Sequence, residues 1–413
     1  MLEKYLEEFQ EEVVRVKTAT RKDMVNKMKE ERIKILHFED VNGYEVMANI
    51  WSLRERFRKV FGQELIPLLL KSIENPMDYD TVDFDMDTHD FSLLDFPFPK
   101  FYEKDGGRYI TSAVVFAEYE GKRNVSFHRM MILDDRRAAI RLVPRDLYRM
   151  HLMAKERGEE LKVGVVIGME PNVLLAAATS VDYSMDEMRI ASSIKYNSSG
   201  FREKVMKTPA GIFVPHNIDL LLEGRITNDY VDEGPFIDIT GTYDIVRKQP
   251  VVVFERFYYR KKPIFHILLP GGYEHYNLMG LPREPTIYRE IKRAGVEVID
   301  VHLTPGGCSW LHAVVKIRKN REDDGKRAIE AAFKGHKSLK HVVVVDEDID
   351  IENMEEVEWA IATRFQGDRD LVKIEKVRGS SLDPSSYEGH LTTKLGLDAT
   401  MPLKGREKFK RYI

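Results

Sequence analysis

The stretch YITSAVVFAEYEGKRNVSFHRMMILDDRRAAIRLV (109–143) decides the fold of the middle of the chain. It holds three strand-like runs, and turn signals at Glu120-Gly121 and Asp134-Asp135 separate them: 109–116, 125–133 and 138–143. Two further runs, VGVVIG and VVVFERFYY, continue the pattern at 163–168 and 251–259. Helical segments are inserted only near 147–157 and 186–194. Many strands with short turns predict a barrel or a strongly bent sheet.

The part before this region reads as a small α/β unit. Residues 2–16 place Leu2, Tyr5, Leu6, Phe9 and Val13 on one helical face. LHFEDVNGYEVMANI (36–50) predicts two strands around an Asn42-Gly43 turn, and a helix follows over 53–70, broken near Pro67. Residues 76–100 lack periodicity and predict a linker.

After about residue 295 strands alternate with helices. VEVIDVHL, AVVKI and HVVVVDEDID are strand-like, whereas KRAIEAAF and MEEVEWAIATRF are helical. This alternation predicts an α/β domain with a parallel sheet, followed by a tail of little pattern, 378–413. We therefore predict three domains: an N-terminal α/β domain at 1–95, a central β domain at 96–295 and a C-terminal α/β domain at 296–413.

Composition excludes several classes of protein. Of 413 residues, 43% are hydrophobic, which is enough for a sizeable core. Lys and Arg number 64 and Asp and Glu 68, so the net charge of −4 offers no basic field for nucleic acid or for a membrane surface. The single cysteine, Cys308, excludes an intrachain disulfide and a thiolate metal cage. The N-terminus is acidic and amphipathic rather than a signal peptide, and no apolar run reaches the ~18 residues of a membrane span. We expect a cytoplasmic enzyme.

A polar cluster lies on the second strand-like run, RNVSFHRMMI (123–132). Strand alternation places Asn124, Ser126 and His128 on one side and Arg129 on the other. An arginine on a largely apolar strand needs a carboxylate or phosphate partner, although a surface strand with exposed polar ends would give the same pattern. Glu187, on the helix near 186–194, has Ile190 and Ala191 beside it and so can point inward; a solvated helix face is the competing interpretation.

The segment EGRITNDYVDEGPFIDITGTYD (223–244) is the most informative. Glu233 and Asp238 lie five residues apart around the rigid Gly234-Pro235 turn, among apolar neighbours. One carboxyl in an apolar pocket can carry a proton near neutral pH, and a second can stay ionised against an arginine. The pair therefore suits general acid–base chemistry, unless the segment is only a turn.

Two Gly-Gly loops, within 268–285 and 303–315, can offer backbone N–H groups to a phosphate or can be plain turns. Cys308, directly after the second Gly-Gly pair, fits a packed small side chain better than a nucleophile. The acidic stretch 346–353 lacks the spacing of a calcium loop and predicts a strand end leading into a helix N-cap.

In this order, the segments DGGRYIT, NVSFHR, IRLV, MDEM, VPHNIDLLLEG, EGPFIDITGTYD, VVVVDEDID and WAIATR resemble the UbiD family of decarboxylases along nearly the whole chain. The resemblance implies an N-terminal α/β domain, a central split β-barrel of the flavin-reductase type and a C-terminal α/β domain that helps to oligomerise. It also implies three cofactors: prenylated FMN, a divalent metal ion (Mn²⁺, or Mg²⁺) and K⁺. A flavin prenyltransferase would supply the flavin, and a homodimer or a higher homo-oligomer is expected.

Site residues follow from the resemblance position by position. Arg129, Glu233 and Asp238 match the family's catalytic arginine, the glutamate paired with it and the acid that delivers the proton. Asn124 and Glu187 match metal ligands. Many relatives have a histidine ligand after IRLV; here VPRDLY offers Asp146 as a hard oxygen substitute. The segments that match flavin contacts are Phe127, His128 and Arg129, and Arg141, Leu142 and Val143.

Further segments, among them GGYEHYNLMGLPREP and LTPGGCSWLHAVV, resemble an archaeal branch of the family. Its members convert trans-anhydromevalonate 5-phosphate to isopentenyl phosphate and CO2 in a mevalonate pathway. Such a substrate needs a phosphate site, for which Arg283 or the amides of the Gly-Gly loops are candidates. An aromatic acid decarboxylase of the 4-hydroxybenzoate type is the alternative. A flavin carrier or a purely structural subunit would not need Arg129, Glu233 and Asp238.

Overall fold

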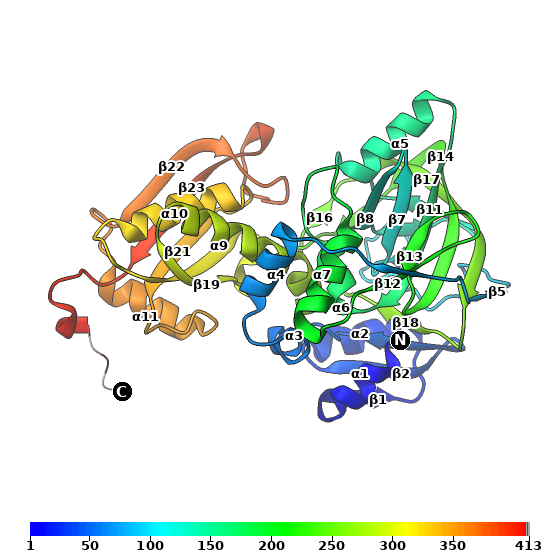
Figure 1. Cartoon of the computed structure of the whole chain (residues 1–413), viewed down its shortest axis with the longest axis horizontal. Helices are drawn as coiled ribbons and strands as arrows, with labels where there is room; N and C mark the ends of the chain where they lie inside the picture. Colours follow the sequence, from blue (N-terminus) through cyan, green and yellow to red (C-terminus); the bar gives the residue numbers. More distant parts are fainter. Residues whose placement is uncertain (410, 412–413) are drawn as a thin grey trace. The chain divides into compact units, whose positions relative to one another are not determined.

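The computed structural model describes residues 1–409 and 411, and the chain forms two compact units, Met1–Leu278 and Met279–Ile413 (Figure 1). The first unit contains the segments predicted for the N-terminal domain and most of those predicted for the central domain. Residues 279–295 of the predicted central domain lie in the second unit with the C-terminal segments. Each unit has sheets and helices of its own, so the chain has the mixed α/β, multidomain fold that its pattern predicts.

A four-stranded sheet in the order β1-β2-β3-β18 forms the N-terminal part of the first unit. Its strands are β1 (Val13–Val16), β2 (Ile35–Val41), β3 (Tyr44–Ala48) and β18 (Ile264–Ile267). The predicted hairpin is confirmed, since Asn42 and Gly43 turn the chain with φ of 54° and 88°. β18 comes from far along the chain and pairs in parallel with β3, which joins residues 264–267 to this sheet.

The first predicted helix is too long. α1 ends at Glu8 (Glu3–Glu8), and Val13 begins a strand instead of a fourth helical turn. The apolar face is real, because Leu2, Tyr5, Leu6 and Phe9 are buried. α2 (Arg21–Glu30) follows with a capping box at Thr20.

The predicted helix over 53–70 is two helices, α3 (Arg54–Phe61) and α4 (Leu65–Glu74). The break lies at Gly62, which has a positive φ of 95° and ends α3. Pro67 lies in the first turn of α4, where backbone N–H groups have no acceptor within the helix, so the N–H that proline lacks is not needed there.

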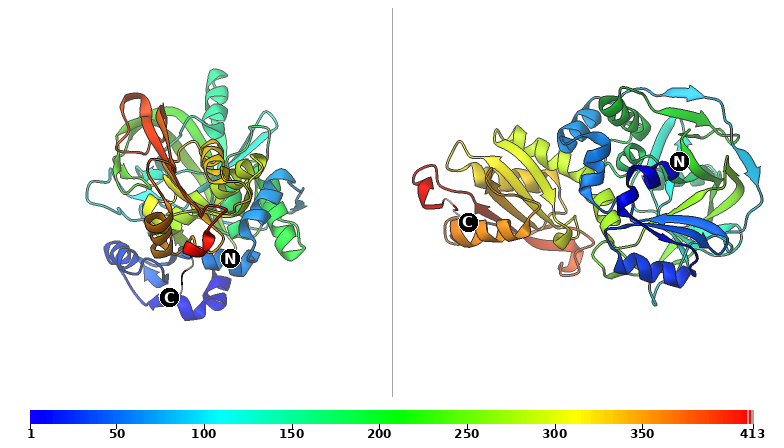
Figure 2. Two further views of the ribbon diagram at one scale, coloured as in Figure 1. Left: turned by 90° about the vertical axis from the view of Figure 1, so that its left-hand side faces the viewer. Right: turned by 90° about the horizontal axis from the view of Figure 1, so that it is seen from below.

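A nine-stranded sheet dominates the first unit (Figures 1 and 2). Its strand order is β6-β9-β10-β17-β14-β11-β7-β8, and β5 pairs with β17. The strands are β5 (Asp87–His89), β6 (Tyr109–Ile110), β7 (Val114–Tyr119), β8 (Lys122–Phe127), β9 (Met130–Ile132), β10 (Arg137–Ile140), β11 (Leu161–Met169), β14 (Ile218–Glu233) and β17 (Arg247–Tyr259). The order is an open path from β6 to β8. The long antiparallel pair β14–β17 carries two register shifts.

Two of the predicted strands are each divided. The run 109–116 becomes β6 and β7, and the run 125–133 becomes β8 and β9. The second break falls at His128 and Arg129, whose side chains bind partners outside the ladder. The third run ends at Ile140, because the N–H of Leu142 bonds to the Gln249 side chain at 2.8 Å rather than to a strand.

Smaller elements complete the first unit. The region predicted as a linker contains β5 and β4 (Asp80–Val82), and β4 joins β12 (Lys204–Lys207) and β13 (Phe213–Pro215) in a three-stranded sheet. β15 (Phe236–Ile237) and β16 (Tyr243–Asp244) form a short hairpin. The helices are α5 (Asp146–Glu156), α6 (Pro171–Ala177), α7 (Glu187–Ser199) and α8 (Tyr273–Gly280), the last ending in the second unit. One continuous core includes Phe38, Val115 and Phe265.

The second unit has one five-stranded sheet, β19-β20-β21-β23-β22. Its elements are β19 (Glu297–Leu303), β20 (His312–Arg318), β21 (His341–Asp346), β22 (Leu371–Arg378), β23 (Leu391–Ala399), α9 (Glu284–Arg293), α10 (Asp324–Gly335) and α11 (Met354–Arg364). Only β20, β21 and β23 are parallel, so the predicted parallel sheet has antiparallel edges. The tail thought to lack pattern supplies β23, which pairs with β21. Asn353 caps α11, as the sequence predicts.

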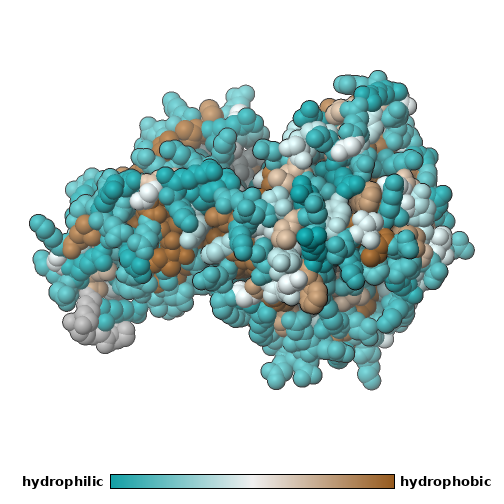
Figure 3. All heavy atoms as spheres, viewed as in Figure 1, coloured by the Kyte–Doolittle hydropathy of each residue, from teal (hydrophilic) through white to brown (hydrophobic). Residues whose placement is uncertain are grey.

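No helix among the described residues is long and apolar enough to cross a membrane. Most of the face shown in Figure 3 is hydrophilic, and its apolar areas are separate from one another.

Candidate active site

Arg129 is the centre of a cluster of carboxylates in the first unit. Its Nε donates to Glu233 Oε1 at 2.9 Å, and its Nη2 donates to Glu233 Oε2 at 3.2 Å. Its Nη1 lies 3.5 Å from Asp238 Oδ2. The three residues that the sequence singles out as catalytic therefore meet in the structure, although 104 positions separate Arg129 from Glu233.

The backbone around the EGPF turn fixes these carboxylates. Glu233 ends β14 and is fully buried, whereas the side chain of Asp238 is 23% exposed. Gly106 packs against the turn so closely that a Cβ there would lie 2.2 Å from Gly234 O, and its N–H bonds to Pro235 O at 2.8 Å. The DGG segment thus serves as a close backbone support for the turn that carries Glu233.

The electrostatics keep Arg129 charged. Burial disfavours the charge, but Glu233, Asp238 and Asp244 outweigh it and hold the pKa of Arg129 above its ordinary value. The guanidinium also lies over the Phe236 ring, 4.8 Å from its centroid. A buried, charged guanidinium beside a partly exposed acid can hold a substrate carboxylate close to a proton donor.

Sequence reasoning missed four residues of this cluster. Asp244 accepts from Arg129 Nη2 at 3.2 Å and also pairs with Arg247. Tyr109 donates to Glu233 Oε1 at 3.1 Å, and burial and Glu233 raise the pKa of Tyr109 well above its ordinary value. His275, on α8, has a pKa lowered by burial despite the charge of Asp238 nearby. Asp244, Tyr109 and His275 lie in segments that carry the family resemblance, although the sequence assigned them no role; Arg247 lies outside those segments.

Asn124 and Glu187 form a second cluster. Glu187, at the start of α7, is 4% exposed and lies 3.1 Å from Asn124 Nδ2, while its Oε2 accepts from the N–H of Val125 at 3.0 Å. Burial raises the pKa of Glu187 to about 8, and Asp186 and Asp146 add to that rise. The Asn124 side-chain amide and the Val125 backbone N–H, which donate to this carboxyl, are neutral groups, so a cation would be stabilised here.

The hydrogen-bond chain beside this pair also suits a cation. His128 Nδ1 lies 2.8 Å from the carbonyl of Arg141, which can only accept, so Nδ1 carries the proton. Burial lowers the pKa of His128 to about 4, which leaves Nε2 as an acceptor, 2.9 Å from Ser126 Oγ. Ser126 has one hydrogen for both this nitrogen and Asn124 Oδ1, which lies 2.8 Å away. Turning the Asn124 amide over would let Nδ2 donate to Ser126 Oγ. It would place Oδ1 against a Glu187 oxygen, where the two oxygens need a cation or a proton between them.

Asp146, the third predicted metal ligand, has no hydrogen bond to Asn124 or Glu187 among the described residues. Asp146 begins α5, and it acts on the pKa of Glu187 through its charge. Burial raises the pKa of Asp146 itself. Among residues 1–409 and 411 no three His, Cys, Asp or Glu side chains form a group that could hold a metal ion, so the ligand role of Asp146 stays a prediction.

The predicted flavin segments lie between the two clusters. Phe127, His128 and Arg129 link Ser126 to the carboxylates, and the N–H of Arg141 bonds to the carbonyl of Arg129 at 3.1 Å. Leu142 is buried, whereas the side chain of Val143 is 38% exposed. A partly exposed edge beside a charged arginine suits a planar, polar cofactor, and the assignment of these contacts stays a prediction.

The first Gly-Gly loop does not offer free amides to a phosphate. The N–H of Gly271 bonds to His275 Nδ1 at 3.1 Å, and the N–H of Gly272 bonds to Leu269 O at 3.0 Å. Arg283 and the second Gly-Gly loop belong to the second unit, in which the Arg283 guanidinium lies over Trp310.

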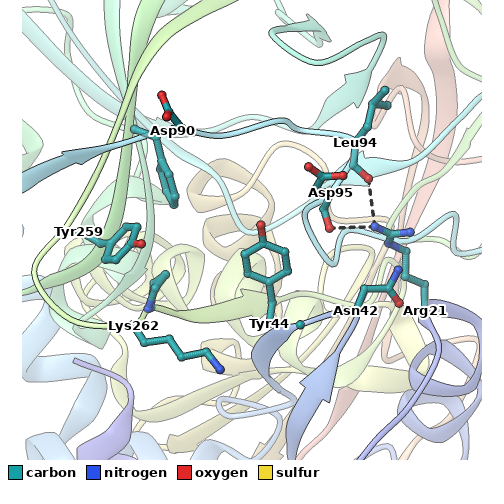
Figure 4. A pocket seen from close by; sticks show the side chains of 11 residues that line it. Arg21, Asn42, Tyr44, Asp90, Leu94, Asp95, Tyr259 and Lys262 are labelled. Atoms are coloured by element: carbon teal, nitrogen blue, oxygen red, sulfur yellow. Dashed lines mark hydrogen bonds between the residues drawn. The ribbon is translucent and has the colours of Figure 1, made fainter.

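A cavity of about 600 Å³ opens elsewhere in the first unit (Figure 4). Tyr44, Asp95 and Tyr259 line it, together with Arg21, whose guanidinium bonds to the backbone carbonyls of Leu94, Asp95 and Phe96. Arg21 thus ties the segment before β6 to α2. The cavity shares no lining residue with the two clusters.

Comparison with known families identifies the chain. The domain family described as 3-octaprenyl-4-hydroxybenzoate carboxy-lyase Rift-related domain matches residues 77–273, and the corresponding C-terminal domain family matches residues 276–399. The chain belongs to the UbiD family of carboxy-lyases. The family and the decarboxylase class expected from the sequence are confirmed.

Curated relatives include archaeal proteins named anhydromevalonate phosphate decarboxylase. The one from Methanocaldococcus jannaschii is 44% identical over 390 residues, which cover 92% of this chain and 91% of the relative. The one from Methanothermobacter thermautotrophicus is 49% identical over 322 residues, which cover 77% of this chain and 75% of the relative.

Solved structures of UbiD-class enzymes share the fold. HmfF from Pelotomaculum thermopropionicum in complex with FMN is 33% identical, with a TM-score of 0.93 and coverage of 100% of this chain and 97% of the other. An evolved dimeric form of HmfF in complex with prFMN is 31% identical, with a TM-score of 0.90 and coverage of 100% and 96%.

Proposed function

We propose that this UbiD-family chain is a prenylated-FMN-dependent decarboxylase that converts trans-anhydromevalonate 5-phosphate to isopentenyl phosphate and CO2 in a mevalonate pathway. The observation that carries the proposal is Arg129, held by Glu233 on one side and facing Asp238 on the other. The names of the archaeal relatives, at 43–49% identity, support the choice of substrate.

Each residue of the cluster has a role. Arg129 binds and orients the substrate carboxylate, because its charge is maintained in a mostly buried setting. Glu233 fixes the plane of the guanidinium through two hydrogen bonds, and Tyr109 fixes Glu233. Asp238, the more exposed of the two acids, delivers a proton to the α-carbon after CO2 leaves.

The electrons left by CO2 need an acceptor that no side chain provides. Prenylated FMN would supply that electron sink when it is bound. The segments at 127–129 and 141–143 would contact it, with the nine-stranded sheet acting as the split β-barrel of the family. The solved UbiD-class structures with FMN and prFMN support this assignment.

Asn124 and Glu187 would hold a divalent metal ion, Mn²⁺ or Mg²⁺, with Asp146 as a third ligand. Their oxygen chemistry and the raised pKa of Glu187 support a hard cation. K⁺ would be a further ion. We also propose that the chain forms a homodimer or a higher homo-oligomer, for which the dimeric form of HmfF is a precedent.

The test is to co-express the chain with a flavin prenyltransferase and assay it on trans-anhydromevalonate 5-phosphate. We expect isopentenyl phosphate and CO2 to form, and the unsupplemented protein to be inactive. A parallel assay on 4-hydroxybenzoate tests the aromatic alternative. Turnover of the aromatic acid alone would overturn the proposed substrate and retain the reaction class.

A further inference from the structure

Asp244 lies between two arginines at the candidate active site. Its Oδ2 accepts from Arg129 Nη2 at 3.2 Å, and its Oδ1 pairs with Arg247 Nη1. The Asp244 side chain is 15% exposed, and the pairing of β16 with β15 holds its backbone. One anchored carboxylate therefore sets the position of Arg247 relative to Arg129.

The arginines and carboxylates around Asp244 are unevenly paired. Arg129 has Glu233 and Asp238 as partners in addition to Asp244. Among the described residues, Arg141 and Arg247 form an ion pair only with Asp244, and Arg141 Nε lies 3.8 Å from its carboxylate. The proximity of Arg247 contributes to the lowered pKa of Arg141, after the larger effect of burial. The three arginines and three carboxylates of the cluster balance overall, but Arg141 and Arg247 share one carboxylate, and this local surplus of positive charge beside Asp244 favours an anionic ligand.

Arg247 is the arginine that can meet that anion. Its side chain is 36% exposed, and its hydrogen bonds to described residues all use Nη1, to Asp244 and to the carbonyl of Ile245 at 3.2 Å. Nε and Nη2 have no hydrogen-bond partner within the described part of the chain. Arg141 is less exposed and donates to its neighbour Leu142 O at 3.1 Å. A guanidinium with an open edge presents the paired donors that a phosphate accepts.

We propose that Arg247 binds the phosphate group of the substrate, and that Asp244 is the positioning residue that holds Arg247 beside Arg129. The inference rests on the proposed function. A short acid with a carboxylate at one end and a phosphate at the other would extend from Arg129 to Arg247, past the Asp244 carboxylate. The site would thereby select phosphorylated acids over neutral ones of the same length.

The experiment compares two substrates in the cofactor-loaded enzyme: trans-anhydromevalonate 5-phosphate and the same acid with a free hydroxyl. In Arg247→Gln we expect KM for the phosphorylated acid to rise about 10- to 100-fold, since one charged pair is lost. We expect kcat to change little and kcat/KM for the unphosphorylated acid to stay the same. Arg247→Lys should restore part of the affinity. Lys248→Gln, at the exposed neighbouring position, is the matched control.

A binding measurement separates the substrate phosphate from the flavin phosphate. By calorimetry, isopentenyl phosphate should bind Arg247→Gln about 10- to 100-fold more weakly than the parent chain, while flavin absorbance per protein stays equal. Loss of flavin in the variant, or an equal loss of activity on both acids, would overturn the inference. If the parent enzyme turns over neither acid yet still binds isopentenyl phosphate through Arg247, the proposed function fails and the phosphate site stands.

Discussion

Asp238 is the residue at which the proposed chemistry is most directly tested. In Asp238→Asn the side chain keeps its shape and its contact distance to Arg129, but it can no longer deliver a proton. We expect kcat for decarboxylation to fall at least about 100-fold, the usual contribution of a positioned acid. Flavin absorbance should be retained, because Asp238 lies outside the predicted flavin segments.

Asp232→Asn is the control for that variant. Asp232 lies near the end of β14, the strand that leads into the turn before Asp238, and forms an exposed ion pair with Lys248 at 3.1 Å. Its replacement should leave kcat unchanged. Full turnover by Asp238→Asn would remove Asp238 from the mechanism.

A substitution of Glu187 tests whether a metal ion or a proton neutralises its buried carboxylate. Glu187→Gln mimics the protonated carboxyl and removes a metal ligand, so we expect the metal-to-protein ratio to fall by more than about tenfold. Elemental analysis of protein co-expressed with the prenyltransferase measures this ratio. Glu160→Gln, at an exposed ion pair with Arg225, is the control. Unchanged metal content in Glu187→Gln would mean that Glu187 is not a metal ligand, and that a proton alone lies between Asn124 and Glu187.

Residue types in order along the chain revealed Arg129, Glu233, Asp238, Asn124 and Glu187, and the structure brings these into two clusters. Asp244 and Arg247 could not be found in this way. Their role depends on the β15–β16 hairpin, which returns Asp244 to Arg129 across 115 positions of sequence. Asp244 ends the two-residue strand β16 and Arg247 begins β17, and such strand ends carry no sequence pattern that predicts their side-chain partners.

The turn after β14 depends on a close backbone contact. In Gly106→Ala the new Cβ would lie 2.2 Å from Gly234 O, so the two loops must separate and Glu233 must shift. We expect a loss of stability of about 1–3 kcal/mol, as in other overpacked sites, and a lower kcat/KM. Thermal unfolding and a steady-state assay measure both.

Gly306→Ala is the matched change, because nothing lies within 4 Å of its Cβ position. It should leave both quantities unchanged. Gly106→Ala with the stability and activity of the parent chain would show that the two loops are not constrained by each other.

Strand and helix boundaries show where local pattern stops being sufficient. Apolar runs predicted most strands of the first unit, but they did not show that β6–β7 and β8–β9 are interrupted. At the β8–β9 break, for example, the side chains of His128 and Arg129 bind residues that are distant in sequence. β23 was missed because its alternate buried positions carry polar residues and a glycine rather than apolar side chains, and its place beside β21 comes from tertiary pairing. β18 likewise joins a sheet whose other strands lie within the first 48 residues.

Both units of the chain contain buried histidines, and we expect these to make its stability depend on pH in the acidic range. Burial lowers the pKa of His151, in the first unit, and of His312, in the second, from an ordinary 6.5 to about 4. Each must lose its burial to take up a proton, so the unfolded chain binds more protons between pH 6.5 and 4. Stability is therefore independent of these groups above pH 6.5 and falls as the pH drops through this window.

Each of the two histidines should cost up to about 3 kcal/mol of stability by pH 4, from 1.36 kcal/mol per unit of pKa. We expect His151→Gln to flatten the pH dependence of the first unit and His312→Gln that of the second, when urea unfolding is followed by hydrogen exchange between pH 7 and 4.5. Exchange resolves the two units separately, so each variant serves as the control for the other. His390→Gln, at an exposed position, should change neither profile. If both variants keep the parent slope, the acid sensitivity arises from the buried carboxylates instead, because these also change their protonation in this range.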